Sequence, residues 1–177
     1  HIKNRLLSYN TAPEKLDGVY STDFSTDDVF RSYTAPSGKA SIKYSDESGN
    51  VAITPAAANW YATLNFPFDW DLNGIQTITM DISAATAGSV NIGLYGSDME
   101  VWTKAVDVNT EVQTVTIGIN ELVKQGNPQT DGKLDAALSG IYFGAATADT
   151  GSITIDNVKI VKLATPVYTA NTYPHKD

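Results

Sequence analysis

Hydrophobic and polar residues alternate over many short stretches between residues 19 and 160. In one stretch, Asn91, Gly93 and Tyr95 share one phase, and the intervening aliphatic residues share the other. A period of two residues is typical of a β-strand with one buried face. We therefore predict strands over Val19–Phe24, Ala40–Ser45, Asn50–Thr54, Trp60–Phe68, Gln76–Ser83, Ser89–Tyr95, Val101–Val108, Val112–Ile119, Ile141–Ala145 and Gly151–Ile160.

The spacing of these strands predicts the fold class. Short strands separated by turn residues indicate an all-β, two-sheet antiparallel β-sandwich of the jelly-roll type. The helical candidates are Asn120–Gln125, which ends at Gly126, and Leu134–Leu138. No helix alternates with the strands, which argues against a parallel α/β sheet. Pro67 indicates that the strand carrying it ends there or lies at a sheet edge.

The last strand changes phase in its middle. Ile153 and Ile155 share one face, whereas Val158 and Ile160 share the other, so we predict a one-residue bulge near Asp156-Asn157. A lone carboxylate at such a break has two interpretations. Nearby backbone N–H groups can satisfy it, or it can bind a metal ion that ties the last strand to the first.

The chain has the length of one domain with a sizeable core. Residues 1–17 are polar and irregular, and we interpret them as a linker or an edge segment. Residues 18–163 form the predicted sandwich. Residues 164–177 contain Thr and Pro without a regular pattern, and we interpret them as a linker to a neighbouring domain. Because the chain starts at His1, we interpret it as a fragment of a larger or processed protein.

The composition excludes several classes of partner. The formal net charge is −8, and the Lys and Arg residues are scattered, which argues against nucleic acid and anionic membranes. No apolar run is long enough to span a membrane. There is no cysteine, so disulfides and thiol catalysis are excluded. The few charged residues and the abundance of Thr, Ser, Asn and Gly suit a secreted, monomeric β-rich domain.

Catalytic residues are scarce, and we expect no enzymatic activity. His1 and His175 both lie in the terminal segments, so neither a Ser-His-Asp triad nor a histidine metal site can form. The chain has no E-x-D-x-x-E pattern to present paired carboxylates on one strand face. Among the arginines, Arg31 alone falls within the predicted sandwich, which disfavours a jelly-roll polysaccharide lyase.

Several segments carry a resemblance to a known family. The strand Gly38–Lys43, the strand Val112–Ile117 and the closing Asp156-Asn157-Val158, which follows Leu138–Gly144, resemble bacterial jelly-roll carbohydrate-binding modules of the galactose-binding-like superfamily. The resemblance covers residues 18–162 and implies a non-catalytic module. Such a module would bind a β-linked polysaccharide and target an attached glycoside hydrolase to it outside the cell. One departure is Val112-Gln113, where many relatives carry Trp.

The resemblance also implies a structural calcium ion between the first strand, the segment before the second strand and the last strand. The matching positions are Asp23, the carbonyl of Lys39 and Asp156. Calcium prefers such oxygen ligands. The alternative for Asp23 is that it caps the turn Ser25-Thr26-Asp27.

Tyrosines on the polar phase of the strands are candidates for sugar contacts. Tyr61, Tyr95 and Tyr142 lie out of phase with the aliphatic residues, beside Asn65 and Asn91. Flat rings next to amides and small residues suit a pyranose, whose C–H face stacks while its hydroxyls find hydrogen-bond partners. In contrast, the phase of the other strand aromatics predicts core packing for Trp60, Phe66, Phe68 and Phe143.

Two further aromatic positions are ambiguous. Trp102 shares a phase with Lys104 and two valines, so it either packs in the core or joins Lys104 at the lip of a binding site. Trp70 lies between two aspartates and can be an exposed platform or a core cap. We include Trp102 and Lys104 among the predicted binding residues. The competing function is a structural or adhesive β-sandwich of a cell-surface protein, in which the tyrosines make an interdomain contact.

Overall fold

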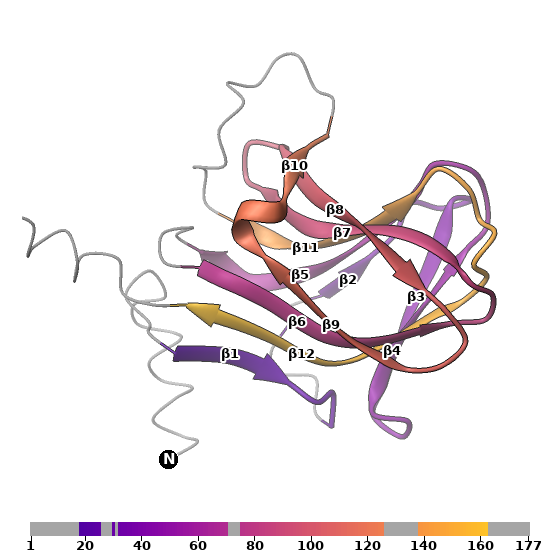
Figure 1. Cartoon of the computed structure of the whole chain (residues 1–177), viewed down its shortest axis with the longest axis horizontal. Coiled ribbons are helices and arrows are strands. Elements are labelled where there is room, and N and C mark those ends of the chain that lie inside the picture. The colour runs from indigo at the N-terminus through magenta and orange to yellow at the C-terminus, as the bar shows by residue number, and fades with distance from the viewer. Residues whose placement is uncertain (1–17, 26–29, 31, 71–74, 126–137, 163–177) are drawn as a thin grey trace, which may run out of the picture.

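The computed structural model describes residues 18–25, 30, 32–70, 75–125 and 138–162, apart from some side chains at the ends of three strands. These residues form two antiparallel sheets packed face to face (Figure 1). The one helical element among them is a short 3-10 helix, η2 (Ile119–Glu121). No helix in the described ranges has the length and apolarity needed to cross a lipid bilayer. The predicted all-β sandwich is therefore confirmed.

The first sheet contains the last strand near its centre. Its order is β3-β4-β12-β6-β9, and β1 also pairs with β12. All of these pairings are antiparallel. The strands are β1 (Gly18–Thr22), β3 (Ala40–Ser45), β4 (Asn50–Pro55), β6 (Ile75–Ala84), β9 (Gln113–Gly118) and β12 (Ile153–Lys162).

The second sheet contains the predicted tyrosine positions. Its order is β10-β8-β7-β11-β5-β2, again antiparallel throughout. The strands are β2 (Ser32–Thr34), β5 (Trp60–Trp70), β7 (Gly88–Gly96), β8 (Val101–Val108), β10 (Val123–Lys124) and β11 (Leu138–Ala145).

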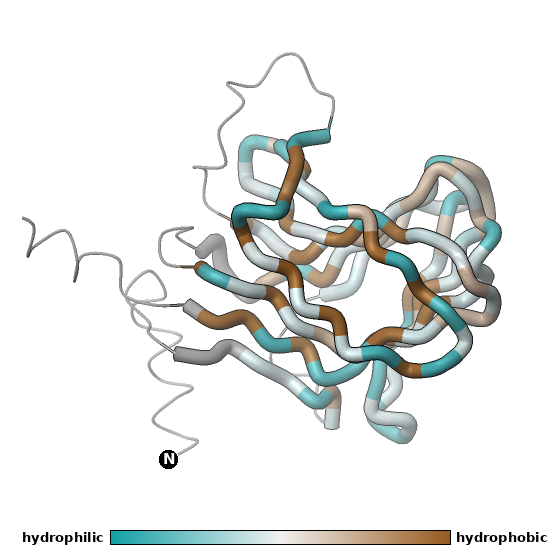
Figure 2. Tube along the Cα trace, viewed as in Figure 1, coloured by the Kyte–Doolittle hydropathy of each residue, from teal (hydrophilic) through white to brown (hydrophobic). Residues whose placement is uncertain are grey.

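The hydrophobic core fills the space between the sheets. Along most strands, hydrophobic residues alternate with polar ones, as the sequence pattern predicts (Figure 2). Trp60, Phe66 and Phe143 are buried in this core, which confirms their predicted role. A fully buried side chain of this kind contributes about 1.5–3 kcal/mol relative to an exposed one. Burial between the sheets therefore leaves the outer face of each sheet available for other roles.

The predicted bulge in the last strand is confirmed. The register between β12 and β6 shifts between Asp156 and Lys159, and Asn157 adopts a φ of 50°. The extra residue reverses the phase, so Ile155 before the bulge and Val158 after it both face the core. A left-handed conformation at a non-glycine residue is uncommon, and Asn tolerates it better than most side chains.

Other predictions from the sequence need correction. The helix expected over Asn120–Gln125 is wrong, because η2 lasts a single turn and β10 follows it. Pro67 does not end its strand, since β5 continues to Trp70. The pairing of β5 with β2 stops at Asn65, and the register with β11 shifts between Asn65 and Trp70, so Pro67 lies in an irregular part of the strand. The short strands β2 and β10 were not predicted. The expected helix over Leu134–Leu138 and both terminal linkers fall largely or wholly outside the described residues, although Leu138 begins β11.

Candidate functional site

Three tyrosines lie on the outer face of the second sheet. Tyr61 comes from β5, Tyr142 from β11 and Tyr95 from β7. Their phase is opposite to that of the buried residues on the same strands, such as Leu64 and Ile92. We call this surface the tyrosine face. The described residues whose register places them on it are Ser32, Thr34, Tyr61, Thr63, Asn65, Ser89, Asn91, Gly93, Tyr95, Val101, Thr103, Ala105, Asp107, Val123, Gly140, Tyr142 and Gly144.

Glycines on β11 let two of the tyrosine rings lie down on the sheet. A Cβ atom added to Gly140 would stand 2.8 Å from Cε1 of Tyr95, and one added to Gly144 would stand 3.0 Å from Cε1 and Oη of Tyr142. Both rings therefore lie over backbone that carries no side chain. The backbone oxygens of Leu64 and Trp60 would also crowd the added Cβ atoms, at 2.4 Å and 2.9 Å. A ring that lies over glycine offers its other face outward, which is the geometry of a stacking platform.

Tyr61 and Tyr142 form a near-parallel pair. Their ring centroids are 5.7 Å apart and their planes differ by 11°. At this separation the rings are offset, so each leaves part of its face uncovered by the other. Tyr61 is 42% exposed. Burial, and to a smaller extent the neighbouring Tyr61, raise the pKa of Tyr142, so its phenol stays neutral at physiological pH.

Asn65 is the hydrogen-bonding centre of the tyrosine face. Its Nδ2 donates to Oγ of Ser32 at 3.0 Å and to Oγ1 of Thr34 at 2.8 Å. Its Oδ1 accepts from Oγ1 of Thr63 at 3.0 Å and from the hydroxyl of Tyr95. An amide has two donor hydrogens and two acceptor lone pairs, so these four bonds occupy its full capacity.

The sequence reasoning missed the contribution of β2 to this network. The signal was the Ser-Tyr-Thr alternation at 32–34, which is too short to stand out from a loop. Ser32 pairs with Asn65 in the register, and Thr34 pairs with Thr63. The predicted residue Asn91 also lies on the tyrosine face, opposite Gly144 on one side and Ala105 on the other.

Trp102 and Lys104 lie in the opposite phase from the tyrosine face. Trp102 pairs with the buried Leu94 and packs partly against the core, while its Nε1 donates to Oε1 of Glu100 at 2.8 Å. Lys104 pairs with Ile92. The structure does not bring these two predicted residues together with the three tyrosines. The side chain of Trp70 lies outside the described part of the chain.

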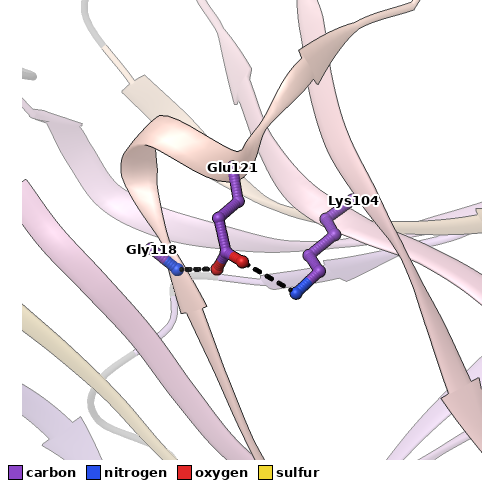
Figure 3. Close-up of polar contacts among 3 residues, drawn as sticks. All are labelled: Lys104, Gly118 and Glu121. Carbon is purple, nitrogen blue, oxygen red and sulfur yellow. Dashed lines mark hydrogen bonds and ion pairs between the residues drawn. The ribbon is translucent and has the colours of Figure 1, made fainter.

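Lys104 instead belongs to a contact at the edge of the sandwich (Figure 3). Its Nζ lies 3.0 Å from Oε2 of Glu121, and Oε1 of Glu121 accepts the backbone N–H of Gly118 at 2.8 Å. The Gly118 N–H and then the Lys104 ammonium lower the pKa of Glu121. This contact joins β8 of the second sheet to the turn in which β9 of the first sheet ends.

Of the three predicted calcium ligands, the structure brings two together. Asp156 stands opposite Asp81 on β6, and Asp23 follows β1, which pairs with β12. Burial raises the pKa of Asp156, and the charges of Asp23 and Asp81 raise it further, although the N–H of Asn157 opposes them. These carboxylates are therefore close enough to repel one another.

Lys39 lies elsewhere, and its assignment to this site is a correction. It precedes Ala40, which pairs with Pro55, whereas Val51 pairs with Ile155 beside Asp156. Four residues of strand separate Val51 from Pro55, which is about 13 Å. The carbonyl of Lys39 also accepts the N–H of Ala56 at 2.7 Å. Lys39 is thus at the opposite end of the β3–β4 hairpin from the two aspartates.

The negative charge of these carboxylates suits a cation, but each has an oxygen engaged in hydrogen bonds within the protein, and together they are not arranged to hold a metal ion. Oδ1 of Asp23 accepts from both N and Oγ of Ser25, as the alternative of a turn cap predicts. Oδ1 of Asp156 accepts from the N–H of Asn157 at 2.7 Å, and the two oxygens of Asp81 accept from Thr114 and Asn157. Within the described ranges, no group of three or more His, Cys, Asp or Glu side chains is placed to hold a metal ion.

Comparison by sequence finds no relatives for the chain. No family model matches it, and no curated protein matches it.

Solved structures with similar folds include carbohydrate-binding modules. The family 11 module of Clostridium thermocellum in complex with a β-1,3-1,4-mixed-linked tetrasaccharide has a TM-score of 0.67 at 18% identity, covering 84% of this chain and 98% of that chain. The family 11 module of a cellulosomal cellulase of the same organism has a TM-score of 0.66 at 19% identity, over 83% and 96% of the two chains. A family 29 module complexed with cellulohexaose has a TM-score of 0.58 at 16% identity, over 83% and 94%. The chain thus has the jelly-roll fold of these modules, as the sequence resemblance implies.

Proposed function

We propose that the chain is a non-catalytic module that binds a neutral β-linked polysaccharide, such as a glucan or a xylan, on the tyrosine face. The observation that carries the proposal is the arrangement of Tyr61, Tyr95 and Tyr142 on one sheet, with rings laid over Gly140 and Gly144. Flat rings surrounded by small residues and hydroxyls suit the alternation of C–H faces and hydroxyls on a sugar chain.

The charge of the tyrosine face supports a neutral ligand. Among the described residues on this face, Asp107 alone carries a charge, and it is negative. The whole chain also has a formal net charge of −8. A polymer of uronic acids would meet repulsion here without a cation to pair with its carboxylates. A neutral polymer avoids this cost.

The expected affinity is modest. One sugar face stacked on one ring removes about 60 Å² of apolar surface from water, worth about 1.5 kcal/mol. Three such contacts and a few hydrogen bonds, less the ordering costs, correspond to a Kd of about 10 µM to 1 mM. Such binding becomes effective when the module is joined to a glycoside hydrolase, because tethering raises the local concentration of substrate. We accordingly propose a monomeric, extracellular module of a polysaccharide-degrading enzyme.

A structural calcium ion is part of the proposal. The charges of Asp23 and Asp81, which raise the pKa of Asp156, support it, since a divalent cation would relieve the repulsion on Asp156. The ion would tie the end of β1 to the bulge of β12, and it would have no direct role in sugar binding.

Affinity gel electrophoresis tests the function. We expect a neutral β-glucan, xylan or mannan in the gel to retard the protein, and alginate or pectin to leave its mobility unchanged. Tyr61→Ala and Tyr142→Ala should each weaken the retardation. Unchanged mobility of the unmodified protein in every neutral polysaccharide would reject the proposal and favour an adhesive β-sandwich instead. Retardation of both variants equal to that of the unmodified protein would place the site elsewhere on the molecule.

A further inference from the structure

The Tyr95 side chain is hydrogen-bonded to a residue two strands away in the sheet. It stands on β7, its ring crosses Gly140 of β11, and its hydroxyl reaches Asn65 on β5. The register places Asn65, Gly140 and Tyr95 in one row across the sheet. The ring is therefore supported by glycine beneath it and anchored by an amide at its far end.

We propose that Asn65 is the positioning residue of the tyrosine face, and that it holds the Tyr95 ring flat without contacting the ligand itself. The proposal rests on the proposed function, because it explains how the binding surface keeps its shape. Asn65 is 5% exposed, and all four of its hydrogen-bonding positions are used within the protein. A sugar hydroxyl would have to displace one of these partners to reach it.

The network also ties the edge of the sheet to the platform. Strand β2 has three residues and, in the described part of the chain, pairs with β5 alone. Two of its hydroxyls, from Ser32 and Thr34, accept the two N–H groups of Asn65. Loss of the amide would remove the side-chain bonds to Ser32, Thr34 and the Tyr95 hydroxyl together, while the backbone pairing of β2 with β5 would remain. The Tyr95 ring would lose the bond that fixes its far end, and ligand binding would have to restore the orientation of the ring at a cost in affinity.

A double-mutant cycle separates positioning from direct contact. Asn65→Ala and Tyr95→Phe each remove one end of the same hydrogen bond. We expect each to raise the Kd for cellohexaose or the β-1,3-1,4-mixed-linked tetrasaccharide by about three- to tenfold, the value of one hydrogen bond. If Asn65 acts through Tyr95, the Kd of the double variant will be no higher than that of the single variant with the lower affinity. Losses that multiply would show that Asn65 affects binding independently of Tyr95, which would overturn the proposal.

A matched control removes a hydrogen bond on the other sheet. In Thr114→Val, the hydroxyl that donates to Asp81 at 2.6 Å is lost, and the substitution lies on β9 of the first sheet. We expect this variant to lower the melting temperature without changing the Kd. Calorimetry and the melting curves of all variants then distinguish a loss of positioning from a general loss of stability.

A second measurement does not depend on any glycan. With ring-labelled tyrosine, NMR should show an ordered Tyr95 ring and a slowly exchanging hydroxyl proton in the unmodified protein. Asn65→Ala should shift the Tyr95 ring signals and expose the hydroxyl to exchange. An unchanged Tyr95 ring in Asn65→Ala would overturn the positioning role even if glycan binding is confirmed. Absence of glycan binding with a mobilised ring would instead reject only the proposed function.

Discussion

Tyr61 and Tyr142 meet diagonally across two neighbouring strands. In the register, Tyr61 stands opposite Gly144 and not opposite Tyr142. The absence of a side chain at Gly144 lets the Tyr142 ring lie along its own strand until its plane is within 11° of that of Tyr61. Two rings from different strands thereby lie nearly parallel and next to each other on the tyrosine face.

Removal of the Tyr142 ring should weaken binding. We expect Tyr142→Ala to raise the Kd for a bound polysaccharide by about tenfold, because one stacked ring contributes about 1.5 kcal/mol. Tyr142→Phe keeps the ring and should bind nearly as well. Isothermal titration calorimetry checks both, with Lys159→Ala on the outer face of the first sheet as the surface control. An unchanged Kd in Tyr142→Ala would contradict the proposed platform.

Two glycines of the tyrosine face should respond differently to a methyl group. At Gly144, the added Cβ would meet the Tyr142 ring at 3.0 Å and the carbonyl of Trp60 at 2.9 Å. At Gly93 it would lie 1.8 Å from the backbone oxygen of Trp102. At Gly144 the Tyr142 ring can tilt away and the Trp60 carbonyl has to move only slightly, whereas the overlap at Gly93 is so deep that β8 has to move away from β7.

We therefore expect Gly144→Ala to fold and to lose affinity because the Tyr142 ring is lifted. Gly93→Ala should lose about 3 kcal/mol of stability or more, at or beyond the upper end of ordinary overpacking. Urea denaturation measures the free energy of unfolding of each variant. Equal stability of the two variants would show that β7 and β8 can separate at Gly93 at little cost.

The fold could be predicted from the sequence because the alternation of hydrophobic and polar residues is a local pattern within each strand. The alternation along Ser89–Tyr95 and Val101–Val108 is dictated by which side of a strand faces the core, and the two observed strands, β7 and β8, cover these ranges. The bulge at Asn157 was visible for the same reason, as a change of phase. Strands β2 and β10 are too short to show any period.

The site was only partly predictable because it depends on pairing between strands. The phase of Tyr61, Tyr95 and Tyr142 placed them correctly on the outer face. Which residues they lie next to depends on the register, which local sequence does not encode. The same limitation explains Lys39, which is close to the aspartates in the order of elements but far from them along the hairpin.

Lys104 should stabilise the sandwich edge and leave the binding surface intact. Its partner Glu121 has a pKa below the ordinary value of 4.5, so the ionised pair favours the folded state above that pH. This contribution disappears as the pH falls through the pKa of Glu121 in the folded protein. We expect Lys104→Ala to lower the melting temperature slightly at pH 7 and not at pH 2, with an unchanged Kd. Because the pair is exposed, the shift should be small. A large loss of affinity in Lys104→Ala would show that Lys104 contributes to the binding site.

Asp156 offers a test of calcium that does not require seeing the ion. Burial and the charges of Asp23 and Asp81 raise its pKa, so its ionisation disfavours the folded state once the pH exceeds its value in the unfolded chain. In EDTA, Asp156→Asn should therefore raise the melting temperature at pH 7.

Added calcium should raise the melting temperature of the unmodified protein, since the ion binds the folded state alone, and should have little effect on the variant. Thr154→Ala, two residues earlier on the same strand, is the matched control and should respond to calcium like the unmodified protein. Identical melting curves with EDTA and with calcium would reject the calcium proposal, while a higher melting temperature of Asp156→Asn would still establish the repulsion among the carboxylates.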